Sequence, residues 1–136
     1  MAKKLETGVK FTNSMVVKDE LTVAALPLSI GDFSGMPPVF GTPYLVAFIE
    51  GTCLAGLKEY IEPGQRTVGT HINISHSAAT PVGMKVTCEA ELVSTTAGGK
   101  LMELKVICRD EVQVISEGTH GRAIIDFDKF MSKLAK

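Results

Sequence analysis

Three side chains have the types and the spacing for acid–base chemistry: Thr42, Glu50 and His76. On a helix, Glu50 has Val46 and Leu54 as its neighbours one turn away in each direction. A carboxylate with apolar neighbours is costly unless it is paired, and desolvation raises its pKa, as suits a general base or a nucleophile. A structural glutamate that reaches solvent or a partner subunit fits the same pattern equally well.

His76 falls on the same face as Ile74 if the segment is a strand, and that face should meet the helix. An inward imidazole there can orient Glu50 or a reacting water. The alternative is a core histidine whose ring is satisfied by a backbone carbonyl. His71 falls on the opposite face, and His120 lies in the last strand without comparable partners in the sequence, so both are weaker candidates.

Thr42 precedes Pro43, a pair that predicts a helix start with Thr42 as the cap and Pro43 in the first helical position. Capping explains this threonine without any catalysis. A hydroxyl beside free backbone amides, at the positive end of the helix dipole, can also hold a developing oxyanion or a carboxylate. If both residues are helical, Thr42 and Glu50 lie about 12 Å apart along the axis, so contact requires a folded-back loop or a neighbouring chain.

One long apolar helix and five strand-like segments must position these groups. The helix is expected from Pro43 to near Tyr60, with apolar residues over more than half of its circumference and a sliver of mostly small residues on the rest. Strands are expected at 9–17, 67–78, 84–95, 100–109 and 112–126. We further expect short helices at 21–28 and 126–136, and a breaker-rich loop at 29–41 that can act as a lid.

These elements predict a single α+β domain over residues 1–136 in which a curved antiparallel sheet wraps around one long central helix, the hotdog fold. Such a sheet covers the helix on one side only. The sliver of small residues (Ala47, Gly51, Ala55 and Lys58) and an unpaired strand edge would both be covered by a second copy, which predicts a homodimer.

Composition narrows the function further. A formal charge of −1 gives no basic field for nucleic acid. No apolar run has the length of a signal peptide or a membrane span, so we expect a cytoplasmic protein without membrane association. The three cysteines are isolated within apolar runs and should be buried thiols, and no histidine or cysteine spacing suggests a metal site. We therefore expect a small-molecule ligand.

Basic residues offer one further binding feature. Arg122, Lys100 and Arg109 can meet the phosphates of a nucleotide tail. The alternative is that these single basic side chains are simply solvated.

Several segments, taken in order, resemble one known family. They are Val39–Thr42 before the helix, Glu50 within 48–53, Gly69-Thr70 leading to 76–81, and 118–123 near the end. Together they resemble the fluoroacetyl-CoA thioesterases and their relatives over nearly the whole chain. The resemblance implies a hotdog homodimer that hydrolyses a short-chain acyl-CoA and needs no cofactor beyond the CoA carried by its substrate.

The resemblance also implies site residues. The family's catalytic threonine, glutamate and histidine fall on Thr42, Glu50 and His76, and Gly69 matches a glycine that lines the acyl site. The lid-like segment keeps Phe33 but carries Met36 where the fluoroacetyl-specific member is aromatic, so reaction class carries over and fluoroacyl selectivity does not.

The implied reaction is attack on the thioester carbonyl by water activated at Glu50, or by Glu50 itself through an anhydride. The chemically distinct alternatives are a hotdog acyl-CoA hydratase or dehydratase and a non-catalytic acyl-CoA binding dimer.

Overall fold

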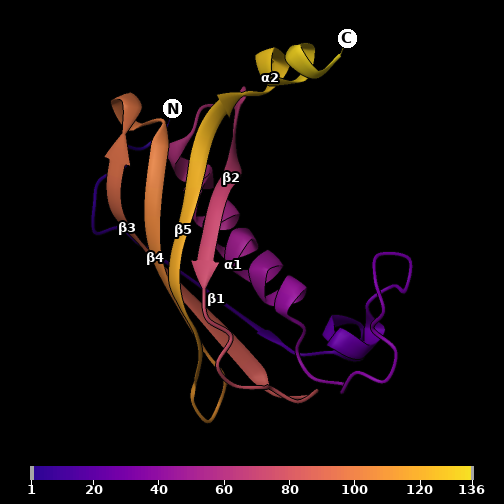
Figure 1. Ribbon diagram of the computed structural model, residues 1–136. Helices are drawn as coiled ribbons and strands as arrows, with labels where there is room; N and C mark the ends of the chain where they lie inside the picture. The colour runs from indigo at the N-terminus through magenta and orange to yellow at the C-terminus, as the bar shows by residue number, and fades with distance from the viewer. Residues whose placement is uncertain (1, 136) are drawn as a thin grey trace.

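A five-stranded antiparallel sheet curves around one helix in the computed structural model, which describes residues 2–135 (Figure 1). The strands lie side by side in the order β1-β3-β4-β5-β2. Their bounds are β1 Lys10–Val16, β2 Gln65–Ile74, β3 Lys85–Thr96, β4 Leu101–Arg109 and β5 Val114–Asp126. This is the predicted hotdog arrangement, with β1 and β2 at the two edges.

Helix α1, Thr42–Leu57, runs across the concave side of the sheet and continues into a 3-10 turn, Lys58–Tyr60, so the predicted end at Tyr60 is confirmed. The predicted cap is wrong. Gly41 is the N-cap, and its carbonyl accepts the Leu45 N–H at 2.9 Å, whereas Thr42 is already the first helical residue. Pro43 follows in the first turn, where a missing N–H costs no helical hydrogen bond.

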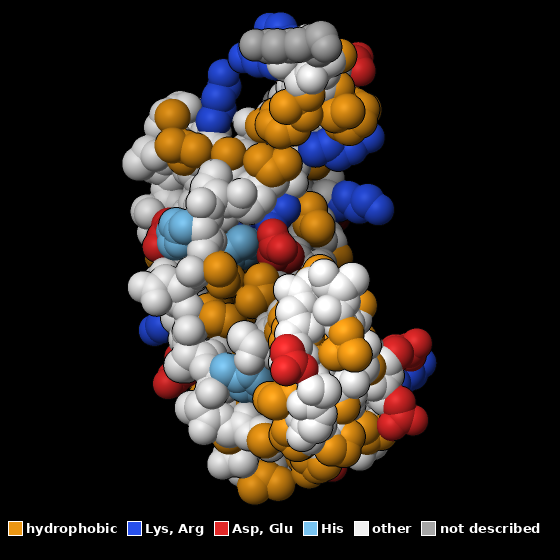
Figure 2. Space-filling view, turned by 45° about the vertical axis from the view of Figure 1, so that its right-hand side comes forward, with side chains coloured by type: hydrophobic (Ala, Val, Ile, Leu, Met, Phe, Trp, Pro, Cys, Tyr) orange, Lys and Arg blue, Asp and Glu red, His pale blue; other side chains and the backbone are white. Residues whose placement is uncertain are grey.

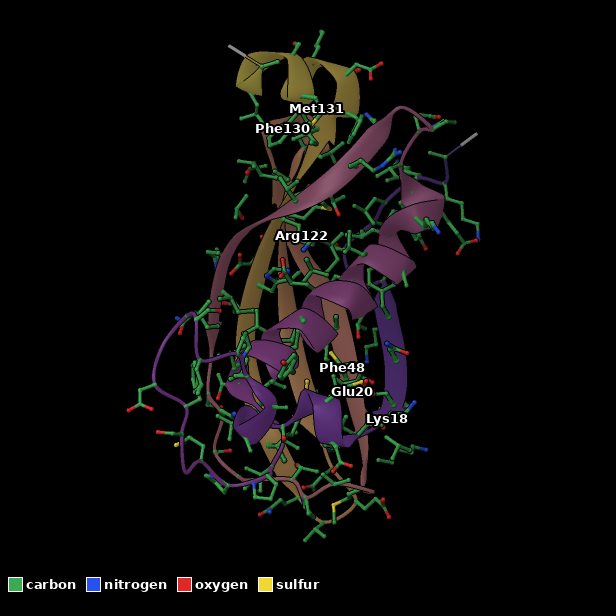
Figure 3. The ribbon with its side chains drawn as sticks, turned by 90° about the vertical axis from the view of Figure 1, so that its right-hand side faces the viewer. Lys18, Glu20, Phe48, Arg122, Phe130 and Met131 are labelled. Atoms are coloured by element: carbon green, nitrogen blue, oxygen red, sulfur yellow. The ribbon has the colours of Figure 1, made fainter. Side chains whose placement is uncertain are left out.

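The core lies between α1 and the inner face of the sheet. Every second residue is buried along β4, and along β3 as far as Leu92. From α1, Leu45, Phe48, Ile49 and Leu57 pack onto this face, and Figure 3 shows Phe48 on the side of the helix toward the strands. All three cysteines are buried and reduced, as expected.

The exposed side of α1 is wider than predicted. Ala47, Gly51, Ala55 and Lys58 are exposed as expected, but Leu54 is also 46% exposed. Burial on most sides is therefore wrong for a single chain, because the sheet covers only one side of the helix.

Two segments differ from the predicted elements. Residues 21–28 form no α-helix: 3-10 turns at Asp19–Leu21 and Val23–Ala25 are separated by Thr22, whose backbone is extended. The loop at 29–41 is confirmed. Strand β2 ends at Ile74 rather than at residue 78, so His76 lies beyond the regular strand.

The last helix, α2 (Phe127–Leu134), is confirmed and is capped by the Asp126 side chain, which accepts the Lys129 N–H. It projects past the end of the sheet (Figure 1). Its apolar side chains, which include the labelled Phe130 and Met131 in Figure 3, are partly exposed. Among residues 2–135, no helix is both long and apolar enough to cross a membrane.

The packing of α1 against β1 makes a stability prediction at Gly56. The ring and Cβ of Phe11 lie so close to Gly56 that a Cβ at this position would overlap them. Phe11 is itself buried, so it has little room to move. We expect Gly56→Ala to lower the free energy of unfolding by about 2 kcal/mol, despite alanine's higher helix propensity. Urea denaturation checks this.

Gly64→Ala is the matched control, because no atom lies within 4 Å of a Cβ added there. Equal stability of the two variants would show that Phe11 repacks freely.

Candidate functional site

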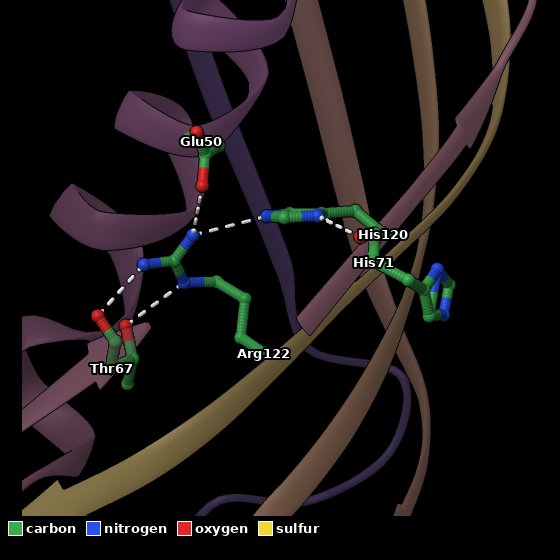
Figure 4. A network of polar contacts seen from close by, with 5 residues as sticks. All are labelled: Glu50, Thr67, His71, His120 and Arg122. Atoms are coloured by element: carbon green, nitrogen blue, oxygen red, sulfur yellow. Dashed lines mark hydrogen bonds and ion pairs between the residues drawn. The ribbon is translucent and has the colours of Figure 1, made fainter. Parts of the chain in front are cut away.

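Glu50 and Arg122 form an ion pair where α1 crosses β5 (Figure 4). Arg122 Nη1 donates to Glu50 Oε2 at 3.1 Å. The Glu50 side chain is 39% exposed, and its apolar neighbour Leu54 is open to solvent in the single chain, so the expected apolar neighbours do not remove this carboxylate from water. Glu50 is thus a carboxylate that is held on one oxygen and accessible.

Arg122 is the buried anchor of this pair, with a side chain that is only 3% exposed. Besides Glu50, its guanidinium donates to Thr67 twice: Nε to Oγ1 at 3.0 Å and Nη2 to the carbonyl oxygen at 2.8 Å. The solvated alternative is wrong for Arg122. Figure 3 shows it between the sheet and α1, where it fixes the position of Glu50.

His120 completes the cluster from the same face of β5. It is 1% exposed, and its Nδ1 lies 2.8 Å from the carbonyl oxygen of His71. Its Nε2 lies 3.1 Å from Arg122 Nη1. From the sequence alone His120 is a weak candidate, because the partners of its ring come from strand pairing that the linear sequence does not display.

Gly69 leaves the space that brings Glu50 onto the sheet. A Cβ built on Gly69 would stand 2.6 Å from Glu50 Oε2 and 3.5 Å from the His120 ring. A pocket of about 230 Å³ opens here. Its walls come from α1, β2 and β5: Val46, Glu50, Gly69, Thr70, His71, Ile72 and His120. On this face, Figure 2 shows histidine, acidic and basic side chains beside one another above a hydrophobic group.

Thr42 and His76 form a second cluster at the start of α1. Thr42 Oγ1 lies 2.7 Å from His76 Nδ1. His76 therefore meets the helix as predicted, but through Thr42 and not through Glu50. Its Nε2 is buried and has no hydrogen-bond partner among the described residues. Eight residues separate Thr42 from Glu50 in α1, so the two clusters lie about 12 Å apart along its axis.

The other predicted binding residues lie in the loop before α1. Phe33 is half-buried and Met36 is 44% exposed. Neither lines the pocket beside Glu50 in the single chain. Among residues 2–135, no three histidine, cysteine or acidic side chains come together as a metal site.

Both site histidines have a pKa below the ordinary value, which sets a stability prediction. Burial lowers the pKa of His76; burial and the nearby Arg122 lower that of His120, and the bond to the His71 carbonyl partly offsets this. Below about pH 6.5 the unfolded chain binds protons that the folded chain does not. Stability should therefore fall with decreasing pH, by up to about 1.4 kcal/mol per pH unit for each histidine.

Urea midpoints between pH 8 and pH 5 check this, with His76→Asn expected to flatten the slope. The lowered pKa values of Asp32 and Asp110 act below about pH 3.8, outside this window. A constant midpoint down to pH 5 would contradict the prediction.

The arrangement fits hydrolytic chemistry. A carboxylate held on one oxygen and open on the other can take a proton from water or attack a carbonyl carbon. A hydroxyl paired with an imidazole can donate to a developing oxyanion. The fold is that of the hotdog proteins, and these groups are suited to the hydrolysis of a thioester.

Comparisons with known proteins identify the family. The family model described as FlK, fluoroacetyl-CoA-specific thioesterase, matches residues 12–128. The fluoroacetyl-CoA thioesterase of Streptantibioticus cattleyicolor is 37% identical over 134 residues, which cover 98% of this chain and 95% of that protein. This chain therefore belongs to the FlK family of thioesterases.

Solved structures agree. A single-residue variant of the fluoroacetyl-CoA-specific thioesterase FlK superposes with a TM-score of 0.92 at 37% identity, covering 98% of this chain and 97% of that one. A thioesterase superfamily member from Thermus thermophilus superposes with a TM-score of 0.83 at 22% identity, over 96% of this chain and 90% of that one, which shows the shared fold.

Proposed function

We propose that this acyl-CoA thioesterase acts on short acyl groups, with Glu50 as the catalytic carboxylate. The observation that carries the proposal is the Glu50 side chain itself: Arg122 holds one oxygen, the side chain remains 39% exposed, and the group borders a pocket of only about 230 Å³. A pocket of this size suits an acyl group of a few carbon atoms. Structures of the related FlK enzyme hold fluoroacetate with CoA, or acetyl-CoA.

Two routes to the free acid and CoA use these groups. Glu50 can accept a proton from water as the water oxygen bonds to the thioester carbonyl carbon, after which the carbon–sulfur bond breaks and CoA leaves as the thiol. Alternatively, a Glu50 oxygen bonds to that carbon, CoA leaves, and water then hydrolyses the anhydride. In both routes Thr42 can hydrogen-bond to the carbonyl oxygen where negative charge develops.

The substrate is tested by measuring thiol release from acetyl-, fluoroacetyl-, propionyl-, hexanoyl- and dodecanoyl-CoA. We expect kcat/KM to be highest for the two- and three-carbon acyl groups. Comparison with the Met36→Phe variant tests whether an aromatic side chain in the loop favours fluoroacetyl-CoA over acetyl-CoA. A preference for long acyl groups would contradict the small-pocket proposal.

We also propose a homodimer that covers the exposed side of α1. Within residues 2–135, β2 pairs only with β5, so one of its edges lacks a strand partner. Beside it stand Leu54 at 46% and Ile72 at 37% exposed, along with the small residues of α1. A second copy that meets this surface buries apolar side chains and satisfies the strand edge.

Leu54→Glu should therefore convert a dimer to a monomer, because it places a charge in an apolar interface. Light scattering after gel filtration measures the mass. Val112→Glu is the control: Val112 is 74% exposed in the turn between β4 and β5. A monomeric wild-type protein would contradict the proposed assembly.

The dimer can unite the two clusters that one chain keeps about 12 Å apart. We propose that one copy supplies Glu50 and the other supplies Thr42 with His76. Mixing and refolding the inactive variants Glu50→Gln and His76→Asn tests this. A shared site regenerates one intact site in each mixed dimer, whereas sites contained in one chain recover no activity.

A further inference from the structure

We infer that His120 is a positioning residue for the reaction at Glu50, because it accepts a hydrogen bond from Arg122 and so directs the guanidinium group that holds the carboxylate. The inference rests on the proposed role of Glu50. His120 does not contact Glu50 through a hydrogen bond in the described chain; it acts through Arg122.

The contacts of the ring determine where its proton lies. Nδ1 stands 2.8 Å from the carbonyl oxygen of His71, which can only accept, so Nδ1 carries the hydrogen. Nε2 stands 3.1 Å from Arg122 Nη1, which can only donate, so Nε2 must present its lone pair. The neutral Nδ1–H tautomer alone satisfies both contacts.

This tautomer determines where the two hydrogens of Arg122 Nη1, the nitrogen that contacts the Glu50 carboxylate, are directed. Arg122 Nη1 has two hydrogens: one is directed to Glu50 Oε2 at 3.1 Å, and His120 Nε2 receives the other. The remaining contacts of the guanidinium go to Thr67, on its other side. Because acceptors stand at two different edges of this planar group, the guanidinium cannot turn without losing hydrogen bonds. Glu50 Oε2 is therefore held in place while the other oxygen remains available to react.

The surroundings keep His120 neutral. The ring is 1% exposed, and the charged groups around it are Arg122 on β5 and Glu50 on α1, with His71 on β2 behind it. A second proton on Nε2 would point at Arg122 Nη1, donor against donor, and would place two positive charges side by side. Burial lowers the pKa of His120 in the same direction.

Two variants separate the two ring contacts. In His120→Gln, the side-chain oxygen reaches the Nε2 position and can accept from Arg122. In His120→Asn, the shorter amide reaches the Nδ1 position and can donate to His71, but it leaves Arg122 without its acceptor. We expect His120→Gln to keep kcat within about tenfold of the wild type and His120→Asn to lower it about 100-fold, both with little change in KM.

If His120 only ties β5 to β2, His120→Asn should be the less damaging variant, since Asn keeps the contact with His71. Equal kcat values for the two folded variants, or a higher kcat for His120→Asn, would overturn the inference. Thermal melting of both variants accompanies the kinetics, because a loss of kcat that merely follows a loss of Tm also overturns it.

The tautomer is read independently in the wild-type protein by ¹⁵N NMR of labelled histidine at pH 7.5. His71→Asn and His76→Asn serve to assign the three rings. We expect His120 to carry its proton on Nδ1; a proton on Nε2, or on both nitrogens, would overturn the inference even if no His120 variant folds. Because this measurement needs no substrate, an inactive wild-type protein contradicts the proposed function alone.

Discussion

Glu50→Gln should lower kcat for acetyl-CoA hydrolysis by about 10³-fold and leave the folded state intact. Glutamine has the shape of glutamate, and its carbonyl oxygen can still accept the hydrogen bond that Arg122 Nη1 donates at 3.1 Å. The amide cannot take a proton from water at neutral pH or form an anhydride, so both proposed routes fail. The measurement is the initial rate of thiol release, with circular dichroism to compare the folds.

Glu59→Gln is the matched control for that variant. Glu59 lies just past the end of α1, its side chain is 64% exposed, and it pairs with Lys3 at 2.8 Å, away from the pocket. We expect it to retain the wild-type kcat. A Glu50→Gln protein that retains more than a tenth of the wild-type kcat would remove Glu50 from the proposed chemistry.

The fold was largely predictable because the spacing of apolar residues distinguishes strands from helices. The strand-like segments at 84–95 and 100–109 and the apolar run of α1 each correspond to an observed element. Two predictions failed for local reasons. Thr42 does not cap α1, since its hydroxyl bonds to His76, and residues 21–28 break into 3-10 turns at the extended Thr22.

The site was less predictable because its contacts depend on how distant strands align. A bulge between Gly69 and His71 shifts the register of β2 against β5. That register places Gly69 opposite Arg122 and turns the His71 carbonyl toward His120. A bulge leaves no periodic pattern in the sequence. Arg122 could therefore be predicted only as a solvated or phosphate-binding residue, and Thr67 could not be predicted as a site residue.

The environment of Glu50 shows a different limit. A helical wheel places Leu54 beside it, but a wheel does not say which apolar residues are covered. In one chain Leu54 remains 46% exposed, and Glu50 gains its fixed position from a buried arginine 72 residues away in sequence. The structure therefore stabilises this carboxylate by an ion pair with Arg122 and does not enclose it in an apolar pocket.

Arg122→Met should lower the free energy of unfolding by about 3 kcal/mol and reduce kcat at least about 100-fold. Methionine can fill the path of the arginine stem, but it removes every donor to Thr67, Glu50 and His120. His120 Nε2 and the Thr67 carbonyl then each lose the hydrogen bond that Arg122 donates, and an unsatisfied buried polar group costs about 1–3 kcal/mol. Urea denaturation and thiol release measure the two effects.

Arg109→Met, at the exposed end of β4, controls for the loss of one positive charge and should change neither quantity. A stable but inactive Arg122→Met protein would mean that Arg122 orients Glu50 without supporting the fold, because apolar replacement of buried ionic groups is sometimes neutral. The double variant with Glu50→Gln separates these contributions, since only the shared part of the two stability losses belongs to the contact between them. An active Arg122→Met protein would show that Glu50 needs no anchor, and the positioning role of His120 would fail with it.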